Sequence, residues 1–532
     1  MNAQPPDNPV LHPYVAYIKH RLEALLRYVD LESDGEVVQP TAIRLRRPER
    51  WATERWPSLL DALGPLSGYC NAHCDFCYEV GNPLPCERTM LSLDEARTRV
   101  ACYNAASGRG ILQLTTRLSL EPFLNPHLLE LLALIRRHSP SELISLTTNG
   151  AFLTPDVLDR LAALQPVCLV ISVNSADARR RRDLMHDPHA AVALQALPLL
   201  RERAIPFVGS VVAWPTLSAE ELQATIRFID GFQPRRIRVG LPGYSRFFSE
   251  QTLFDTHATW QALCAQLEAL RPQLASPLLI LPNLYAGLPL VPRIDGVVPN
   301  SPAQHAGVRY GDMVRAVDGQ PVRTRRQARA LLEQAEATAH AAQIELERDG
   351  CALSITLREA DDPQTDLYPY KPLGWQAPYH YPSAQGPMGF GALLNEDVEI
   401  ASIARLVEIV ARSGAHRVLL LTTEIMGPIV ATALDSIPDL NSSLAGVELH
   451  MVVPRHRFWG GNIMMGDLYM VSDYYHAACE FIANTGDPPD LIVLPSSFAT
   501  EFGRDLLGVP YLEIERRLDI PVELVPCPRI LT

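Results

Sequence analysis

The stretch SGYCNAHCDFCYEVGNP, residues 67–83, places Cys70, Cys74 and Cys77 in one loop with a CxxxCxxC spacing. A structural zinc site needs four ligands in tetrahedral geometry, so zinc would have to recruit His73 or a distant cysteine. A cluster of four irons that is held by three cysteines instead leaves one iron open to a further ligand. From the residues alone, an iron–sulfur cluster, a zinc site and a group of thiols that binds nothing therefore all remain open.

The size and composition of the chain indicate a globular protein with several domains. Its 532 residues exceed the size at which one hydrophobic core keeps growing, and 47% of them are hydrophobic. Charged residues or prolines interrupt every apolar run before it is long enough to span a membrane. The N-terminal residues lack the basic and apolar segments of a secretory signal, and we therefore expect a cytoplasmic protein.

The charge and the cysteine pattern exclude other classes. A formal net charge of -13 argues against a general nucleic-acid binder, which needs a clustered basic surface. The basic run Arg179–Arg182 is interpreted as the solvated face of a helix. The cysteines outside the CxxxCxxC loop are scattered singly, which indicates a reducing compartment rather than a disulfide framework.

The pattern along the chain predicts an α/β protein with an N-terminal extension at residues 1–60 and three domains. Strand and helix patterns alternate over residues 61–285, which indicates a parallel sheet covered by helices. Residues 286–360 combine short strand patterns with one helix and predict a small α+β domain. Residues 361–532 begin with a linker rich in Pro and Asp and then return to alternating helices and strands, which predicts a second α/β domain.

The cysteine loop, with Phe76 directly before its last cysteine, resembles that of the radical S-adenosylmethionine (radical SAM) superfamily. The resemblance implies a partial (β/α)6 barrel in which Cys70, Cys74 and Cys77 hold a 4Fe-4S cluster. The open iron would chelate the methionine moiety of S-adenosylmethionine (SAM). Reductive cleavage of SAM would then give a 5'-deoxyadenosyl radical that abstracts hydrogen from a substrate, with a flavodoxin or ferredoxin as the implied reductant.

A second stretch, SLEPFLNP at residues 119–126, lies where this superfamily keeps a GGEP-like motif that contacts SAM. The motif's Glu and Pro are present as Glu121 and Pro122, and the resemblance implies that Glu121 contacts the cofactor. Ser119 and Leu120 replace the two glycines, which puts backbone contacts to SAM in doubt. Glu121 could alternatively be a favourable charge at the N-terminus of the following helix.

Two later strand ends carry further candidate SAM contacts. The sequence LTTNGAFLT resembles the TNG strand ending of the superfamily and implies that Thr148 and Asn149 face SAM, although Asn-Gly is also a common turn. The strand VCLVISVNS would project Ser172 and Asn174 to one face, where they could contact SAM or cap the strand end. After the next strand, Ser218 begins a sequence typical of a helix N-terminus.

Residues 297–334 resemble a bacterial PDZ domain through the pattern VxPxSPAxxAGxxxGDxxxxVDG, in which Gly307, Gly311 and Gly319 mark tight turns. PDZ domains add a peptide C-terminus as a strand at a sheet edge and bind its carboxylate in a backbone nest. The carboxylate loop would lie near residues 287–290, whose GLPL sequence departs from the GLGF-like pattern. Peptide binding and a purely architectural role therefore both remain open.

The region VVPRHRFWGGNIMMGDLYMVSDYYHA, residues 452–477, resembles an uncharacterised C-terminal domain that accompanies radical SAM and PDZ-like modules. Two aromatic residues and two glycines in Phe458–Asn462 could cap the mouth of the barrel, or they could belong to an ordinary packed core. The leading hypothesis is an oxidoreductase-type radical SAM enzyme. The alternatives are a peptide-binding or protein-binding scaffold with a degenerate barrel, and radical modification of a peptide or protein that the PDZ domain delivers.

Overall fold

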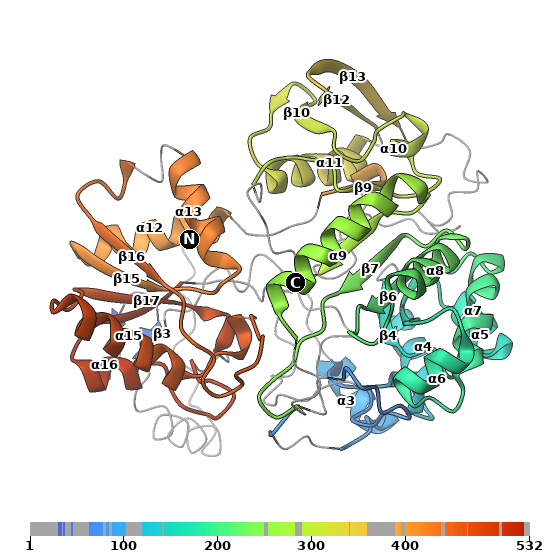
Figure 1. Ribbon diagram of the computed structural model, residues 1–532, viewed down its shortest axis with the longest axis horizontal. Coiled ribbons are helices and arrows are strands. Elements are labelled where there is room, and N and C mark those ends of the chain that lie inside the picture. Colours follow the sequence, from blue (N-terminus) through green and yellow to red (C-terminus); the bar gives the residue numbers. More distant parts are fainter. Residues whose placement is uncertain are drawn as a thin grey trace, which may run out of the picture.

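Three compact units are visible in the computed structural model of the chain (Figure 1). The structure describes residues 30–33, 36–37, 44–45, 63–77, 81–84, 88–102, 120–140, 143–248, 254–281, 290–339, 341–358, 389–394, 400–437, 442–464, 466–499 and 503–525. Most of the predicted N-terminal extension lies outside these residues. Within it, the short strands β1 (Asp30–Ser33), β2 (Glu36–Val37) and β3 (Arg44–Leu45) form a sheet of order β2-β1-β3.

The first unit is built on a parallel sheet of order β4-β5-β6-β7-β8. Its strands are β4 (Ile144–Thr148), β5 (Val167–Ser172), β6 (Phe207–Val212), β7 (Arg236–Gly240) and β8 (Leu278–Leu281). The helices of this unit are α3 (Leu93–Cys102), α4 (Leu128–His138), α5 (Pro155–Ala162), α6 (Ala178–Met185), α7 (Ala190–Glu202), α8 (Ala219–Asp230) and α9 (Thr256–Leu270).

One face of this sheet forms the main hydrophobic core. Alternate strand residues such as Leu169, Ile171 and Val239 pack with leucines and isoleucines of α4, α5, α7, α8 and α9. The helices begin where the sequence provides side-chain caps. Ser218 and Glu221 form a complete capping box at the start of α8, as the sequence predicts.

The second unit is a small antiparallel sheet of order β11-β10-β12-β13 with two helices. Its elements are β9 (Gly296–Val297), α10 (Pro302–His305), β10 (Met313–Val317), β11 (Gln320–Pro321), α11 (Arg325–Ala339), β12 (Ala341–Arg348), β13 (Cys351–Arg358), η4 (Gly389–Gly391) and β14 (Ala392–Leu393). Strand β14 pairs with β9, and Phe390 lies in the core of this unit. The chain therefore returns to the second unit after residue 360, where the sequence places a domain boundary.

The third unit is a parallel sheet of order β16-β15-β17-β18. Its elements are α12 (Ile400–Ser413), β15 (Arg417–Leu421), α13 (Met426–Ser436), β16 (Glu448–Val452), η5 (Gly466–Leu468), α15 (Val471–Thr485), β17 (Leu491–Pro495), η6 (Ser496–Phe498), α16 (Glu513–Leu518) and β18 (Val522–Val525). Two separate hydrophobic cores cover the two faces of this sheet.

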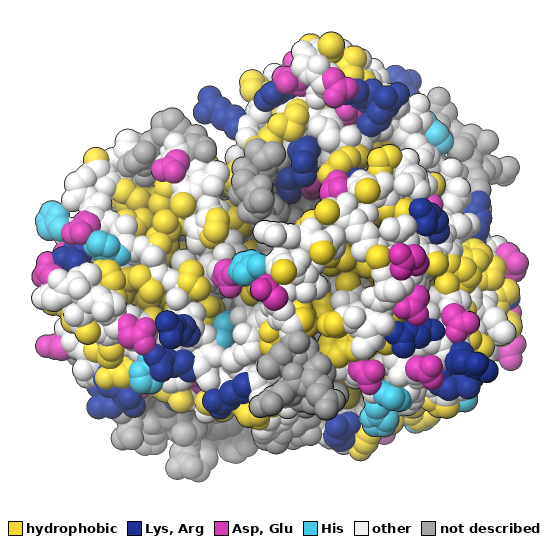
Figure 2. All heavy atoms as spheres, in the orientation of Figure 1, with side chains coloured by type: hydrophobic (Ala, Val, Ile, Leu, Met, Phe, Trp, Pro, Cys, Tyr) yellow, Lys and Arg dark blue, Asp and Glu magenta, His cyan; other side chains and the backbone are white. Residues whose placement is uncertain are grey.

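These units confirm the predicted α/β class, with a partial barrel, a small α+β unit and a C-terminal α/β unit. Within the described ranges, no helix has the length and hydrophobicity needed to span a bilayer. On the face drawn in Figure 2, Lys and Arg side chains are interspersed with Asp and Glu and do not gather into one basic patch.

Candidate active site

The cysteine loop is fixed against the end of helix α6. The backbone N–H of His73 donates to the carbonyl of Met185 at 3.0 Å, and that of Asp75 donates to the carbonyl of Leu184 at 3.0 Å. The side chains of His186 and Asp75 lie 2.8 Å apart, between Nε2 and Oδ1. The loop that carries the three cysteines is therefore held by both backbone and side-chain contacts.

The three cysteines Cys70, Cys74 and Cys77 are all partly exposed and free of disulfides. Burial, together with the nearby thiols of Cys77 and Cys70, raises the pKa of Cys74 to about 12. Burial also raises the pKa of Cys70. Binding of a metal centre would therefore displace protons from these thiols, as is usual for thiolate ligands.

The donor set of this loop consists of three cysteine thiols, the ligand type of iron–sulfur clusters. Within the ranges that the structure describes, no three Cys, His, Asp or Glu side chains are grouped closely enough to hold a single ion. Cys70, Cys74 and Cys77 share one loop and influence one another's charge, which fits a 4Fe-4S cluster with three protein ligands.

Asn149, at the end of β4, connects the cysteine loop to the sheet. Its Nδ2 donates to Asn71 Oδ1 at 2.7 Å and lies 3.8 Å from Cys70 Sγ. The N–H of Ala72 also points to Cys70 Sγ, at 3.4 Å. The structure therefore brings the sequence-predicted Asn149 directly beside one of the predicted cluster ligands.

Glu121 is buried and binds the end of β4. Its Oε1 accepts from Thr148 Oγ1 at 2.8 Å, and its Oε2 accepts from the Asn149 N–H at 2.7 Å. The N–H of Phe123 donates to Oε1 at 3.2 Å. Burial raises the pKa of Glu121 to about 7 even though these hydrogen bonds act in the opposite direction. Three of the predicted SAM contacts, Glu121, Thr148 and Asn149, thus form one hydrogen-bonded group.

The stretch that replaces the GGEP glycines pairs with the cysteine loop. The N–H of Leu120 donates to the carbonyl of Ser67 at 2.8 Å, and that of Glu121 donates to the carbonyl of Tyr69 at 2.9 Å. Ser119 lies outside the described residues. The backbone N–H groups of Leu120 and Glu121 therefore have partners within the protein.

The sequence predicts that Ser172 and Asn174 lie on one strand, but in the structure they do not. Ser172 is the last residue of β5, whereas Asn174 has a φ of 60° and lies in a left-handed turn. Asn174 Oδ1 accepts from the Val212 N–H at 2.9 Å, which joins the ends of β5 and β6. The alternation argument fails because the chain turns after Ser172, although both residues lie at the carboxyl edge of the sheet.

Arg181 is the residue that the sequence interpretation missed. The run Arg179–Arg182 is not a uniformly solvated helix face, because the side chain of Arg181 is completely buried. Arg181 forms an ion pair with the buried Asp187 and donates to the carbonyls of Asn149 and Ser172. It therefore joins the ends of β4 and β5 to the segment that follows α6. No signal in the sequence separates Arg181 from its neighbours in the run.

The third unit contacts the carboxyl edge of the first sheet through the segment Phe458–Asn462. The N–H of Tyr244, in the loop after β7, donates to Asn462 Oδ1 at 2.7 Å, and Asn462 Nδ2 donates to the carbonyl of Pro242 at 3.0 Å. A Cβ at Gly461 would lie 1.9 Å from the Tyr244 carbonyl oxygen, so only glycine allows this approach.

The same loop after β7 also contacts the cysteine loop. Ser245 Oγ donates to the carbonyl of Gly81 at 2.8 Å, and Phe248 packs closely against Gly81. The loop therefore lies between residues that follow the three cysteines and the Phe458–Asn462 segment of the third unit. The segment Phe458–Asn462 therefore lies near the carboxyl edge of the first sheet, and the sequence alone leaves open whether it caps the barrel mouth or belongs to a packed core.

The second unit has the turns that a PDZ domain requires. Gly307, Gly311 and Gly319 have φ values of 83°, 90° and 73°, which favour glycine. Residues 287–289 of the expected carboxylate loop lie outside the described residues. This unit is attached to α9, where Tyr310 donates to Glu268 Oε2 at 3.2 Å and its ring lies under the Arg271 guanidinium.

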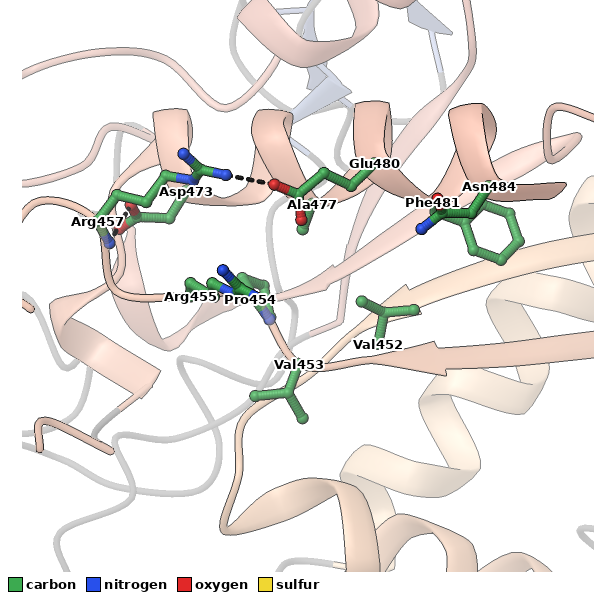
Figure 3. Close-up of a pocket in the computed structure, with 10 residues that line it drawn as sticks. All are labelled: Val452, Val453, Pro454, Arg455, Arg457, Asp473, Ala477, Glu480, Phe481 and Asn484. Carbon is green, nitrogen blue, oxygen red and sulfur yellow. Dashed lines mark hydrogen bonds and ion pairs between the residues drawn. The ribbon is translucent and has the colours of Figure 1, made fainter. Parts of the chain in front are cut away.

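A separate pocket of about 290 Å³ lies in the third unit, between the end of β16 and helix α15 (Figure 3). Its lining is Val452, Val453, Pro454, Arg455, Arg457, Asp473, Ala477, Glu480, Phe481 and Asn484. Arg457 forms an ion pair with Glu480, and its N–H donates to Asp473 Oδ1 at 2.9 Å. The charged groups at the mouth of this pocket are therefore largely paired with one another.

Comparison with known proteins agrees with the assignment of the first two units. Residues 65–229 match the model of the radical SAM superfamily, and residues 293–342 match a PDZ domain model. No curated protein matches the chain.

Among solved structures, Streptococcus suis SuiB bound to its precursor peptide SuiA is similar, with a TM-score of 0.33 and 15% identity over 41% of this chain and 47% of that chain. SuiB bound to S-adenosylmethionine gives a TM-score of 0.33 and 17% identity over 42% and 54% of the two chains. Methylornithine synthase (PylB) gives a TM-score of 0.28 and 13% identity over 41% of this chain and 69% of that chain. The matched part thus spans about half the length of SuiB.

Proposed function

We propose that this chain, in which a PDZ domain follows a radical SAM domain, is a radical SAM enzyme whose 4Fe-4S cluster is held by Cys70, Cys74 and Cys77. Proteins of this superfamily use such a cluster together with SAM. The observation that carries the proposal is the fixed loop that holds three partly exposed thiols, one of which, Cys70, lies 3.8 Å from Asn149 Nδ2. A cluster held by these three cysteines would supply the electron for reductive cleavage of SAM and, through it, hydrogen abstraction from a substrate.

The protein's own residues would orient the cofactor and exclude water. Glu121, through its bonds to Thr148 and Asn149, fixes the end of β4 beside Cys70. We propose that these three residues, together with Ser172 and Asn174, line the SAM site. Asn174 would act mainly by positioning, because its side chain already joins β5 and β6.

The PDZ domain favours a peptide or protein as one class of substrate. PDZ domains bind peptide C-termini, and this one is attached to helix α9 of the radical SAM domain through Tyr310 and Glu268. The C-terminal unit would enclose the substrate from the other side, through Phe458–Asn462. A flavodoxin or ferredoxin in the cytoplasm would supply electrons. A scaffold with a degenerate barrel would have no use for three oxidation-sensitive thiols in one fixed loop.

Iron and sulfide analysis with electron paramagnetic resonance tests the cluster assignment on anaerobically reconstituted full-length protein. We expect about four irons per chain and a reduced-cluster signal that changes when SAM is added. Cys74→Ala should lose both, whereas Cys351→Ala, which changes an exposed cysteine of the PDZ domain, should keep them. Zinc in place of iron, or a cluster signal that SAM does not change, would contradict the proposal.

A further inference from the structure

The inner face of the radical SAM sheet, opposite the helix-covered core, carries an unusual set of polar residues. Gly209 and Ile237 are register partners on the core face, where a Cβ at Gly209 would meet Ile229 of α8. Because neighbouring strand residues point to opposite faces, Ser210 and the arginines Arg236 and Arg238 point to the inner face.

Arg236 is a buried cation, and two of its three guanidinium nitrogens have no hydrogen-bond partner among the described residues. It is only 3% exposed, and its Nε and Nη2 have no acceptor within the part of the chain that the structure describes. The charges that act on it include three further arginines: Arg238, Arg235 and Arg329 of α11. Burial and these like charges lower the pKa of Arg236 to about 9.

Such an arrangement is unfavourable for stability in the absence of an anion. A buried charge that lacks a partner has a large desolvation penalty, and nearby cations add repulsion. The planar guanidinium offers several N–H donors in a geometry that matches the two oxygens of a carboxylate or phosphate. An oxyanion between these arginines would give Arg236 the acceptors that it lacks.

Arg238 lies between Arg236 and the proposed cofactor site. Arg238 is the register partner of Ser210, and its Nε donates to Ser210 Oγ at 2.9 Å. Ser210 is in turn the register partner of Ser172, a proposed SAM-site residue at the end of β5. The backbone of Arg238 is therefore two strand spacings from that of Ser172, roughly 10 Å. A small substrate could span this distance.

We propose that Arg236 and Arg238 bind an oxyanion group of the substrate, a carboxylate or a phosphate, inside the partial barrel. This inference rests on the proposed function, since it assigns the substrate of the radical SAM domain to the anionic class. Arg236 provides the unpaired donors, and Arg238 directs the anchored group toward the carboxyl edge of the sheet, where the cysteine loop lies.

Thermal unfolding of the full-length, cluster-free protein tests this inference without any radical chemistry. Inorganic phosphate and succinate serve as the two probes. At concentrations well above the dissociation constant, phosphate or succinate should raise the Tm of the wild type by about 2–4 °C. The same rise should occur in Arg160→Met, which changes an arginine on the outer surface that is 57% exposed. A response to phosphate alone assigns a phosphorylated substrate, and a response to succinate alone assigns a carboxylate.

The variant Arg236→Met tests whether Arg236 binds an anion or has a purely structural role. In buffer without either probe, its Tm should equal or exceed that of the wild type, because a buried unpaired charge has been replaced by an apolar side chain. The Tm rise with the probe should be lost. Arg238→Met should weaken the response in the same direction. Equal responses of wild type and Arg236→Met, or no wild-type response to either probe, would overturn the inference. This assay needs no cluster. A negative result here would therefore contradict the anion inference alone, and a negative iron analysis would contradict the cluster proposal alone.

Discussion

The two parallel sheets of this protein differ in what covers their faces. In the C-terminal sheet, Leu420 and Val493 belong to one hydrophobic core, and Leu419 and Ile492 belong to another on the opposite face. In the radical SAM sheet the helix-covered face belongs to one large hydrophobic core, and the inner face carries Ser210, Arg236 and Arg238 beside apolar residues such as Val208. Alternation of strands and helices therefore predicts a parallel sheet in both units, whereas the arginines at alternate positions of β7, Arg236 and Arg238, distinguish the radical SAM sheet from the C-terminal sheet.

The largest loss of stability is expected when the buried ion pair at the ends of β4 and β5 in the radical SAM sheet is broken. Arg181→Ala should lower the free energy of unfolding by about 3–5 kcal/mol, because it leaves Asp187 buried without its ion-pair partner. Urea denaturation measures this change. Arg182→Ala, at the exposed neighbour in the same helix, should change the stability by less than about 0.5 kcal/mol. Similar values for the two variants would show that the burial of Arg181 has no energetic role.

The next prediction compares the two sheets directly. Leu420→Ala should cost about 2–5 kcal/mol, since it opens a cavity in one of the two cores of the C-terminal sheet. Ser172→Ala should cost less than about 0.5 kcal/mol, because Arg181 binds the carbonyl of Ser172, which the substitution retains. Denaturation curves of both variants test the contrast. A large loss for Ser172→Ala would mean that the inner face is a packed core and not a chamber.

The stability of the protein should depend on pH through Glu121, the buried carboxyl group beside the end of β4. The pKa of Glu121 is raised from 4.5 to about 7 in the folded protein, so the folded state binds more protons than the unfolded state between these values. The stability from this group is present below about pH 4.5 and is lost as the pH rises to about 7, a change of about 3 kcal/mol. The free energy of unfolding of the wild type minus that of Glu121→Gln should fall by that amount between pH 4.5 and pH 7.5. A constant difference would contradict the raised pKa.

The smallest effect concerns the contact between the two units that contain a parallel sheet. Gly461→Ala and Gly446→Ala both place a side chain at positive φ, but only the first meets a neighbouring atom, the Tyr244 carbonyl oxygen. Gly461→Ala should therefore cost about 1–3 kcal/mol more than Gly446→Ala, which should cost about 1 kcal/mol. Thermal unfolding of both variants provides the comparison. Equal costs would indicate that the segment Phe458–Asn462 does not press against the loop after β7.

The sequence predicts features that depend on local spacing and misses those that depend on distant partners. The CxxxCxxC loop and the PDZ turn glycines are local, and each is found where the pattern places it. The burial of Arg181 depends on carbonyls of Asn149 and Ser172 on other elements, which a run of arginines cannot indicate. The inner-face arginines did leave a signal, because the strand RIRVG alternates arginine with apolar residues.

The most direct test of the central claim is formation of 5'-deoxyadenosine from SAM by the reconstituted, dithionite-reduced protein under anaerobic conditions. The wild type and Cys351→Ala should form the nucleoside, and Cys74→Ala should form none above the background of dithionite and SAM alone. Nucleoside formation that is equal in wild type and Cys74→Ala, or absent from a wild type that contains about four irons per chain, would contradict the assignment of the radical SAM sheet as the active site.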